Sequence, residues 1–163
     1  MFQVGDKIVY PRHGAGVIQA IEEKEVLEKN RLYYILSMPQ TRMQIMVPLD
    51  EAENLGIRSV VEPEVLEKVL SNFHQGQTDP NIYADQRYCR DLNRKKIKTG
   101  DIYQETEIIR DLVRKSHKNK LGAEDANMLN SARQMFISEL MQVKGIAQEQ
   151  ATDLLDTVLA ACS

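Results

Sequence analysis

The sequence predicts an α+β protein of two domains, a small antiparallel β-barrel followed by an all-α domain of about four helices. The first sixty residues consist of short β-rich runs separated by glycine and proline. Beyond residue 81 apolar residues recur at helical spacing, and no further strand-like run follows. The polar stretch His74 to Asn81, which contains both glycine and proline, lies between the two patterns. We therefore expect a barrel domain at residues 1–73, a linker at 74–81 and a helical domain at 82–163.

Five short strands are expected in the barrel domain. They cover Lys7 to Tyr10, Gly16 to about Val26, Arg31 to Met38, Arg42 to Val47 and Ile57 to Val61. In the fourth run Met43, Ile45 and Val47 alternate with Gln44 and Met46, as in a half-buried strand. Five short strands in so few residues favour closure, because closure pairs the edges that an open sheet would expose. We expect an SH3-like or Tudor-like barrel.

Helices are expected from Pro63 onward, since proline suits the first turn of a helix. This first helix continues to about Phe73 and completes the barrel domain. The helical domain then begins with a basic helix from about Ile82 to Ile97. Three more helices follow: one that starts at the N-cap Asp101 after Gly100, one that ends at Gly145, and one that carries the apolar stripe from Ile146 to Leu159.

The chain offers little chemistry for catalysis. Its three histidines, His13, His74 and His117, lie in segments that no pattern brings together, and no Ser/His/Asp or Cys/His arrangement can be argued. Cys89 and Cys162 have no CxxC spacing and no clustered histidine, so we expect free thiols and neither a metal site nor a cofactor. No apolar run reaches the ~20 residues of a membrane span. No secretory signal is visible, so we expect a cytoplasmic protein. Because no catalytic arrangement can be argued, we also expect that the protein is not an enzyme.

Positive charge is concentrated in two segments of this acidic chain, which has a net charge of -3. Gln86 to Lys98 holds six basic residues against one acidic residue, and Arg110 to Lys120 holds five against one. On a helix Arg87, Arg90, Arg94 and Lys98 form a contiguous basic stripe. A solvated charged face is the alternative interpretation.

Aromatic residues beside the stripe favour nucleic acid as its partner, because a ring can pack into a groove while basic groups contact phosphates. Tyr88 as a simple core residue remains an equal alternative. The residues expected to contact DNA are Tyr83, Arg87, Tyr88, Arg90, Arg94, Lys95, Lys98, Arg114 and Lys118.

The barrel is expected to bind protein, because the run Glu22-Glu23-Lys24-Glu25 makes it a poor surface for nucleic acid. Met43 and Met46 lie on opposite faces of one strand, so at most one of them is core, and an exposed methionine is an adaptable contact. A barrel that serves only as a scaffold is the alternative.

Residues 2–16 of the chain read FQVGDKIVYPRHGAG. This opening resembles the pattern VGD-x-VVYP-x-HG-x-G of the CarD and CdnL family of bacterial transcription regulators. Further similar segments follow in order along essentially the whole chain: residues 46–48, 54–58, 87–88, 96–101, 110–112, 128–129 and 131–133.

The resemblance implies a Tudor-like barrel, similar to the polymerase-binding module of transcription-repair coupling factor, that docks on the β subunit of RNA polymerase. It also implies a helical domain that meets promoter DNA near the melted region, where a tryptophan wedges into the minor groove. This chain has no Trp, so Tyr83 or Tyr88 would have to fill that role, and Met46 stands where some relatives have arginine. Polymerase contact is expected at Lys24, Met43, Met46, Val47 and Pro48.

The sequence therefore predicts a transcription regulator that binds the polymerase β subunit and contacts promoter DNA without reading its sequence, so stabilising the open complex. No membrane and no small-molecule substrate is expected as a partner. The alternative is an adaptor whose helical domain binds another protein and not DNA.

Overall fold

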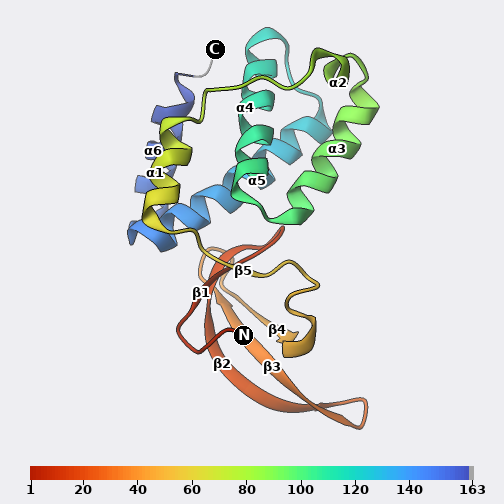
Figure 1. The fold of residues 1–163 in the computed structure, drawn as a ribbon, viewed down its shortest axis with the longest axis vertical. Helices are drawn as coiled ribbons and strands as arrows, with labels where there is room; N and C mark the ends of the chain where they lie inside the picture. Colours follow the sequence, from red (N-terminus) through yellow and green to blue (C-terminus); the bar gives the residue numbers. More distant parts are fainter. Residues whose placement is uncertain (162–163) are drawn as a thin grey trace.

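The computed structural model describes residues 1–161, which form an antiparallel sheet with a stack of helices on one end of it (Figure 1). The strands are β1 (Lys7–Tyr10), β2 (Gly14–Val26), β3 (Lys29–Met38), β4 (Met43–Pro48) and β5 (Arg58–Ser59), with a 3-10 turn η1 (Leu49–Glu51) after β4. Their order in the sheet is β4-β3-β2-β1-β5. The predicted five antiparallel strands are confirmed, although β5 is shorter than the expected Ile57 to Val61.

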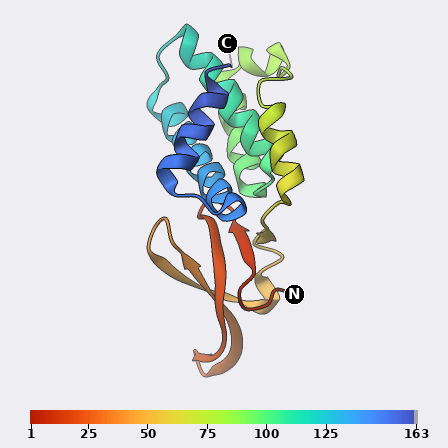
Figure 2. The ribbon, with the colours of Figure 1, turned by 90° about the vertical axis from the view of Figure 1, so that its left-hand side faces the viewer.

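One face of the sheet builds the first apolar core. Tyr34, Leu36 and Met38 alternate along β3 and are buried with Ile8 of β1 and Val47 of β4. The period of two places every second residue of a strand on the same face, so these side chains gather on one side. Strands β2 and β3 continue past this core as a long curved hairpin that projects away from the helices (Figures 1 and 2).

Closure of the sheet into a barrel stays a prediction. Among residues 1–161 the sheet ends with β4 on one side and β5 on the other, and β1 pairs with β5 through only two residue pairs, Ile8 with Ser59 and Val9 with Arg58.

The helices are α1 (Pro63–Ser71), α2 (Pro80–Ala84), α3 (Gln86–Thr99), α4 (Ile102–Lys118), α5 (Ala123–Lys144) and α6 (Gln148–Leu159). The single helix expected over Ile82 to Ile97 is wrong, because Asp85 leaves helical geometry between α2 and α3 and its carboxylate accepts the backbone N–H of Tyr88. The expected stops at Gly100 and Gly145 are confirmed, since both glycines are left-handed with φ of 69° and 64°. Asp101 caps α4 as expected.

Helix α1 packs with the helices and not with the sheet. Leu66, Val69 and Phe73 belong to the same buried cluster as Phe136 of α5, and the two phenyl rings meet edge to face at 5.5 Å. The boundaries 1–73, 74–81 and 82–163 remain a prediction about separate folding units, and this packing favours a boundary before α1. No helix within residues 1–161 is long and apolar enough to span a membrane.

Helix α5 is the central element of the helical half. Every residue from Met135 to Leu140 is buried, because α5 has α1, α3, α4 and α6 packed around it and lies against β2 at the end of the sheet (Figure 2). A helix surrounded in this way needs buried residues on all its faces.

Candidate nucleic-acid interface

The outward face of α3 carries unpaired cations. Asn93 and Ile97 are buried beneath the helix, so the opposite side faces solvent. That side presents Arg87, Lys95 and Lys98, and within residues 1–161 none of the three forms an ion pair. We call these three residues the α3 cations.

Tyr88 lies on the same outward side of α3, with 53% of its surface exposed. A phenol ring in this position is not part of the core, so the interpretation of Tyr88 as a core residue is wrong. Its apolar ring and polar tip are suited to a surface that is partly dehydrated on binding. Of the two candidate tyrosines, Tyr88 is the one that presents its ring to solvent among cations.

Two members of the predicted basic stripe are neutralised by carboxylates. Arg94 contacts Asp91 at 2.6 Å and Glu124 at 3.1 Å, and Arg90 lies 3.6 Å from Glu124 and 3.8 Å from Asp125. Glu124 and Asp125 belong to the first turn of α5, where acidic residues stabilise the helix N-terminus. Of the four residues in the predicted stripe, Arg90 and Arg94 are therefore paired with carboxylates, and among the described residues only Arg87 and Lys98 have no ion pair.

Tyr83 and Arg114 face the segment before α2 and not the α3 cations. Arg114 donates to the backbone carbonyls of Gly76, at 2.7 Å, and of His74. Tyr83 lines a cavity of about 440 Å³ together with Arg114, Lys118, Cys89 and Asp111. Burial and the nearby Asp111 carboxylate raise the pKa of the Tyr83 phenol. Lys118 is exposed at the end of α4.

We expect both cysteines to be free thiols. Cys89 forms no disulfide among the described residues, and burial raises the pKa of its thiol, which makes it a poor nucleophile. Cys162 lies outside the described residues. Within residues 1–161 no group of three or more potential metal ligands is found.

Sequence reasoning missed Arg12, which extends the positive surface beyond α3. Arg12 is exposed in the loop after β1, and it lines the same surface hollows as Lys98. Its backbone is left-handed, with φ of 74°, a conformation that non-glycine residues rarely adopt. The sequence predicts only a tight turn for the loop that contains Arg12. Its position beside α3 depends on how the sheet half packs on the helical half.

The residues expected to contact polymerase divide between the two faces of the sheet. Cross-strand register places Lys24, Met46 and Pro48 on one face, because their partners on β3 are Arg31, Ile35 and Tyr33. Met46 is 45% exposed there, and Lys24 is exposed beside Glu22 at 3.1 Å.

Met43 and Val47 lie on the other face of the sheet. Met43 is exposed near the start of β4, whereas Val47 is only 1% exposed and forms part of the sheet core. The assignment of Val47 to a contact surface is wrong, because its side chain points into the protein.

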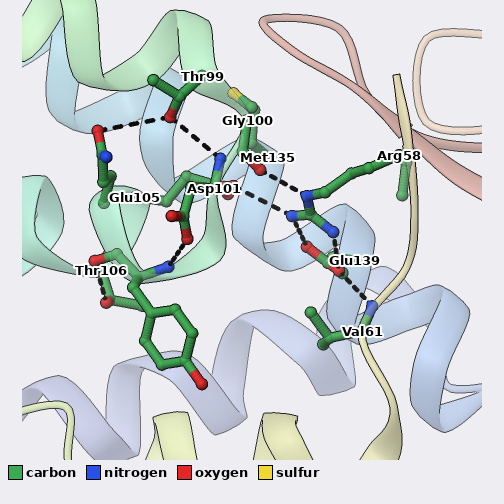
Figure 3. A network of polar contacts seen from close by, with 12 residues as sticks. Arg58, Val61, Thr99, Gly100, Asp101, Glu105, Thr106, Met135 and Glu139 are labelled. Atoms are coloured by element: carbon green, nitrogen blue, oxygen red, sulfur yellow. Dashed lines mark hydrogen bonds and ion pairs between the residues drawn. The ribbon is translucent and has the colours of Figure 1, made fainter. Parts of the chain in front are cut away.

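A polar network joins the sheet to the helices, and sequence reasoning missed it entirely (Figure 3). Arg58 of β5 forms two hydrogen bonds with Glu139 of α5, both 2.8 Å long, and a third of 2.7 Å to the carbonyl of Gly100. Glu105 of α4 lies 3.6 Å from the same guanidinium. The sequence signal for this network is a glutamate within the apolar stripe of each helix. Glu105 lies three residues before Ile108, and Glu139 directly precedes Leu140.

The sheet half and the helical half each match one domain of the same family. The family described as "CarD-like/TRCF RID domain" matches residues 2–61, and "CarD, C-terminal domain" matches residues 68–156. The chain belongs to the CarD family. CarD-family proteins are transcription regulators with an RNA polymerase-interacting domain, which here corresponds to β1 to β5.

Two relatives illustrate the similarity. A Bacillus subtilis (strain 168) protein whose name describes it as a transcription factor, YdeB, is 42% identical over 150 residues, which cover 92% of this chain and 97% of that protein. The solution NMR structure of the 72-residue N-terminal domain of Myxococcus xanthus CarD is 29% identical and covers 36% of this chain and 79% of that chain, with a TM-score of 0.32.

Proposed function

We propose that this CarD-family chain binds the β subunit of RNA polymerase through its sheet half and contacts promoter DNA through α3, without reading the sequence, so that the open complex is stabilised. The observation that carries the DNA part is the outward face of α3, where Arg87, Lys95 and Lys98 have no carboxylate partner within residues 1–161 and Tyr88 is exposed. Lysine and arginine side chains contact phosphates irrespective of base sequence.

The sheet half supports a protein contact better than a nucleic-acid contact. Its hairpin carries Glu22, Glu23, Glu25 and Glu28, which repel phosphate, and its surface includes the exposed Met46. Methionine is flexible and polarizable, so it adapts to an apolar partner surface. Lys24 and Pro48 lie on the same face as Met46, which makes this face the proposed polymerase contact.

Anchoring to polymerase lets weak DNA contacts suffice. A module tethered beside its target acts at high effective concentration, so affinity that is negligible in solution becomes significant in the complex. Stabilisation requires only that the chain bind the open complex better than the closed one, and a difference of about 1.4 kcal/mol changes their ratio about tenfold. No covalent chemistry is involved in this function.

The lifetime of a promoter open complex tests the proposal. Polymerase and promoter are incubated with the wild-type chain or with a variant that carries Arg87→Glu, Lys95→Glu and Lys98→Glu, and dissociation is followed after addition of a competitor. The wild type should lengthen the lifetime and the variant should not. Lys68→Glu is the matched control, because Lys68 is an exposed cation on α1 without an ion pair among the described residues. Equal open-complex lifetimes with the wild type and the triple variant would refute the proposed contact of α3 with promoter DNA.

A protein-interaction adaptor is the second candidate, and the ion pairs of Arg90 and Arg94 favour it, because they remove part of the charge that a polyanion would meet. Under this alternative α3 binds another protein. DNA binding by the full chain that is absent even at low salt would support the adaptor, since phosphate contacts strengthen steeply as salt falls.

A further inference from the structure

One side of α5 forms most of the polar contacts between the two halves. Ser138 accepts the backbone N–H of Ala15 at 2.8 Å, and the carbonyl of Gln142 accepts from Lys7 at 2.8 Å. Gln134 meets Gln40 at 2.6 Å. These α5 residues lie one helical turn apart, so they follow one line along the helix. The sheet is therefore attached to a single face of α5.

Arg58 is the strongest contact on this face. Its guanidinium forms parallel hydrogen bonds with both oxygens of Glu139, the geometry that gives arginine–carboxylate pairs their specificity. Glu139 also accepts the backbone N–H of Val61 at 2.9 Å, where the chain leaves β5 for α1. The carboxylate thus holds a side chain of β5 and the backbone of the segment that follows this strand.

The third bond of Arg58 reaches the end of α3. Its Nε donates to the carbonyl of Gly100, the C-cap residue of α3, which lies two residues after Lys98. The backbone at Gly100 also packs closely on the sheet half, since a Cβ placed there would lie 2.7 Å from Cγ of Pro11. One side chain therefore links β5, the start of α4, α5 and the end of the helix that bears the α3 cations (Figure 3).

A second buried carboxyl group, that of Glu105, lies beside the Arg58 guanidinium. The Glu105 carboxyl is 0% exposed, and neither of its oxygens has a hydrogen-bond partner among the described residues. Burial and the neighbouring Glu139 and Asp101 raise its pKa well above the usual value, whereas Arg58 opposes this shift. Two buried carboxyl groups face one guanidinium, so removal of Arg58 leaves buried groups without their partner.

We propose that Arg58 is a positioning residue that fixes the α3 cations at one orientation relative to the polymerase-binding face of the sheet. This proposal rests on the proposed function, because a fixed orientation matters only if both faces are engaged at once. A rigid connection raises the effective concentration of α3 at the DNA, whereas a loose connection spreads α3 over many orientations.

The test combines a structural and a functional measurement on the full chain. Residual dipolar couplings of the backbone amides report whether both halves share one alignment tensor. We expect one tensor for the wild type and two for Arg58→Met combined with Glu139→Gln, a pair of changes that avoids leaving Glu139 charged and unpaired. The same variant should shorten the open-complex lifetime about threefold or more relative to the wild type, while its binding to isolated polymerase stays unchanged.

Two further variants keep the test decisive. Arg133→Met removes the 2.7 Å pair with Asp156, which joins α5 to α6 within the helical half, and should leave both readouts unchanged. Arg58→Lys keeps the charge but cannot form the parallel bonds, so it should give an intermediate lifetime, and it replaces the double variant if that one does not fold.

Distinct outcomes separate this proposal from the proposed function. A single tensor in the Arg58 variants, or two tensors with an unchanged lifetime, would overturn the positioning role. A wild-type chain without any effect on the lifetime would refute the proposed function instead, and the couplings would still decide whether Arg58 fixes the orientation.

Discussion

Changing the α3 cations to glutamine should reduce the salt dependence of DNA binding by an amount that the structure sets. Arg87, Lys95 and Lys98 have no ion pair among the described residues, so each is available for one phosphate. Each phosphate contact contributes about 0.9 to the slope of log K against log salt. The triple variant should therefore lose a slope of about 2.7. Between 50 and 200 mM salt these three contacts account for about a 40-fold fall in wild-type affinity.

Fluorescence anisotropy of a labelled promoter duplex, titrated with the full chain at several salt concentrations, measures this slope. Arg94→Gln is the matched control on the same helix, because Arg94 is already paired with Asp91 and Glu124 and should release fewer counterions on binding. A slope that falls equally for Arg94→Gln and for Lys95→Gln would contradict the distinction between free and paired cations. A slope that is unchanged in the triple variant would show that the α3 cations do not contact DNA phosphates.

Two further predictions concern stability and the polymerase contact. Glu105 has a raised pKa, so the folded chain keeps a proton that the unfolded chain releases above pH 4.5, and stability falls as pH rises through this window. Glu105→Gln should remove this loss, which urea unfolding at pH 5 and pH 8 measures. Between these pH values its free energy of unfolding should rise relative to that of the wild type by up to about 1.4 kcal/mol per pH unit. The same pH dependence in both chains would contradict this prediction. Met46→Ala should weaken polymerase binding and leave stability within about 0.5 kcal/mol, whereas Val47→Ala should cost about 2 kcal/mol in urea unfolding and leave polymerase binding intact. A Val47→Ala chain that is as stable as the wild type would show that Val47 is not core.

Local signals predicted the elements of this fold well. Glycine at the end of a helix and aspartate before one act through their own backbone neighbours, so Gly100, Asp101 and Gly145 could be placed from the sequence. The same chemistry operates at Asp85, but its capping of α3 was missed because the apolar pattern runs through the break.

Contacts between distant residues could not be predicted. Arg94 is paired with its neighbour Asp91 but also with Glu124, thirty residues away, and the burial of Arg58 depends on helices α4 and α5. Helical spacing places Arg94 on a face of α3 but does not say which element lies beside that face. The candidate site was therefore found on the right helix, whereas the division between free and paired cations required the packing of α5 against α3.

Photo-crosslinking from Tyr88 tests the central claim most directly. A photoreactive phenylalanine analogue replaces Tyr88 in the full chain, which is then bound to polymerase on a promoter and irradiated. We predict a crosslink to promoter DNA that requires polymerase, because the sheet half must first place α3 beside the duplex. Crosslinks to polymerase or other protein alone, with none to DNA, would contradict the claim that α3 contacts the promoter.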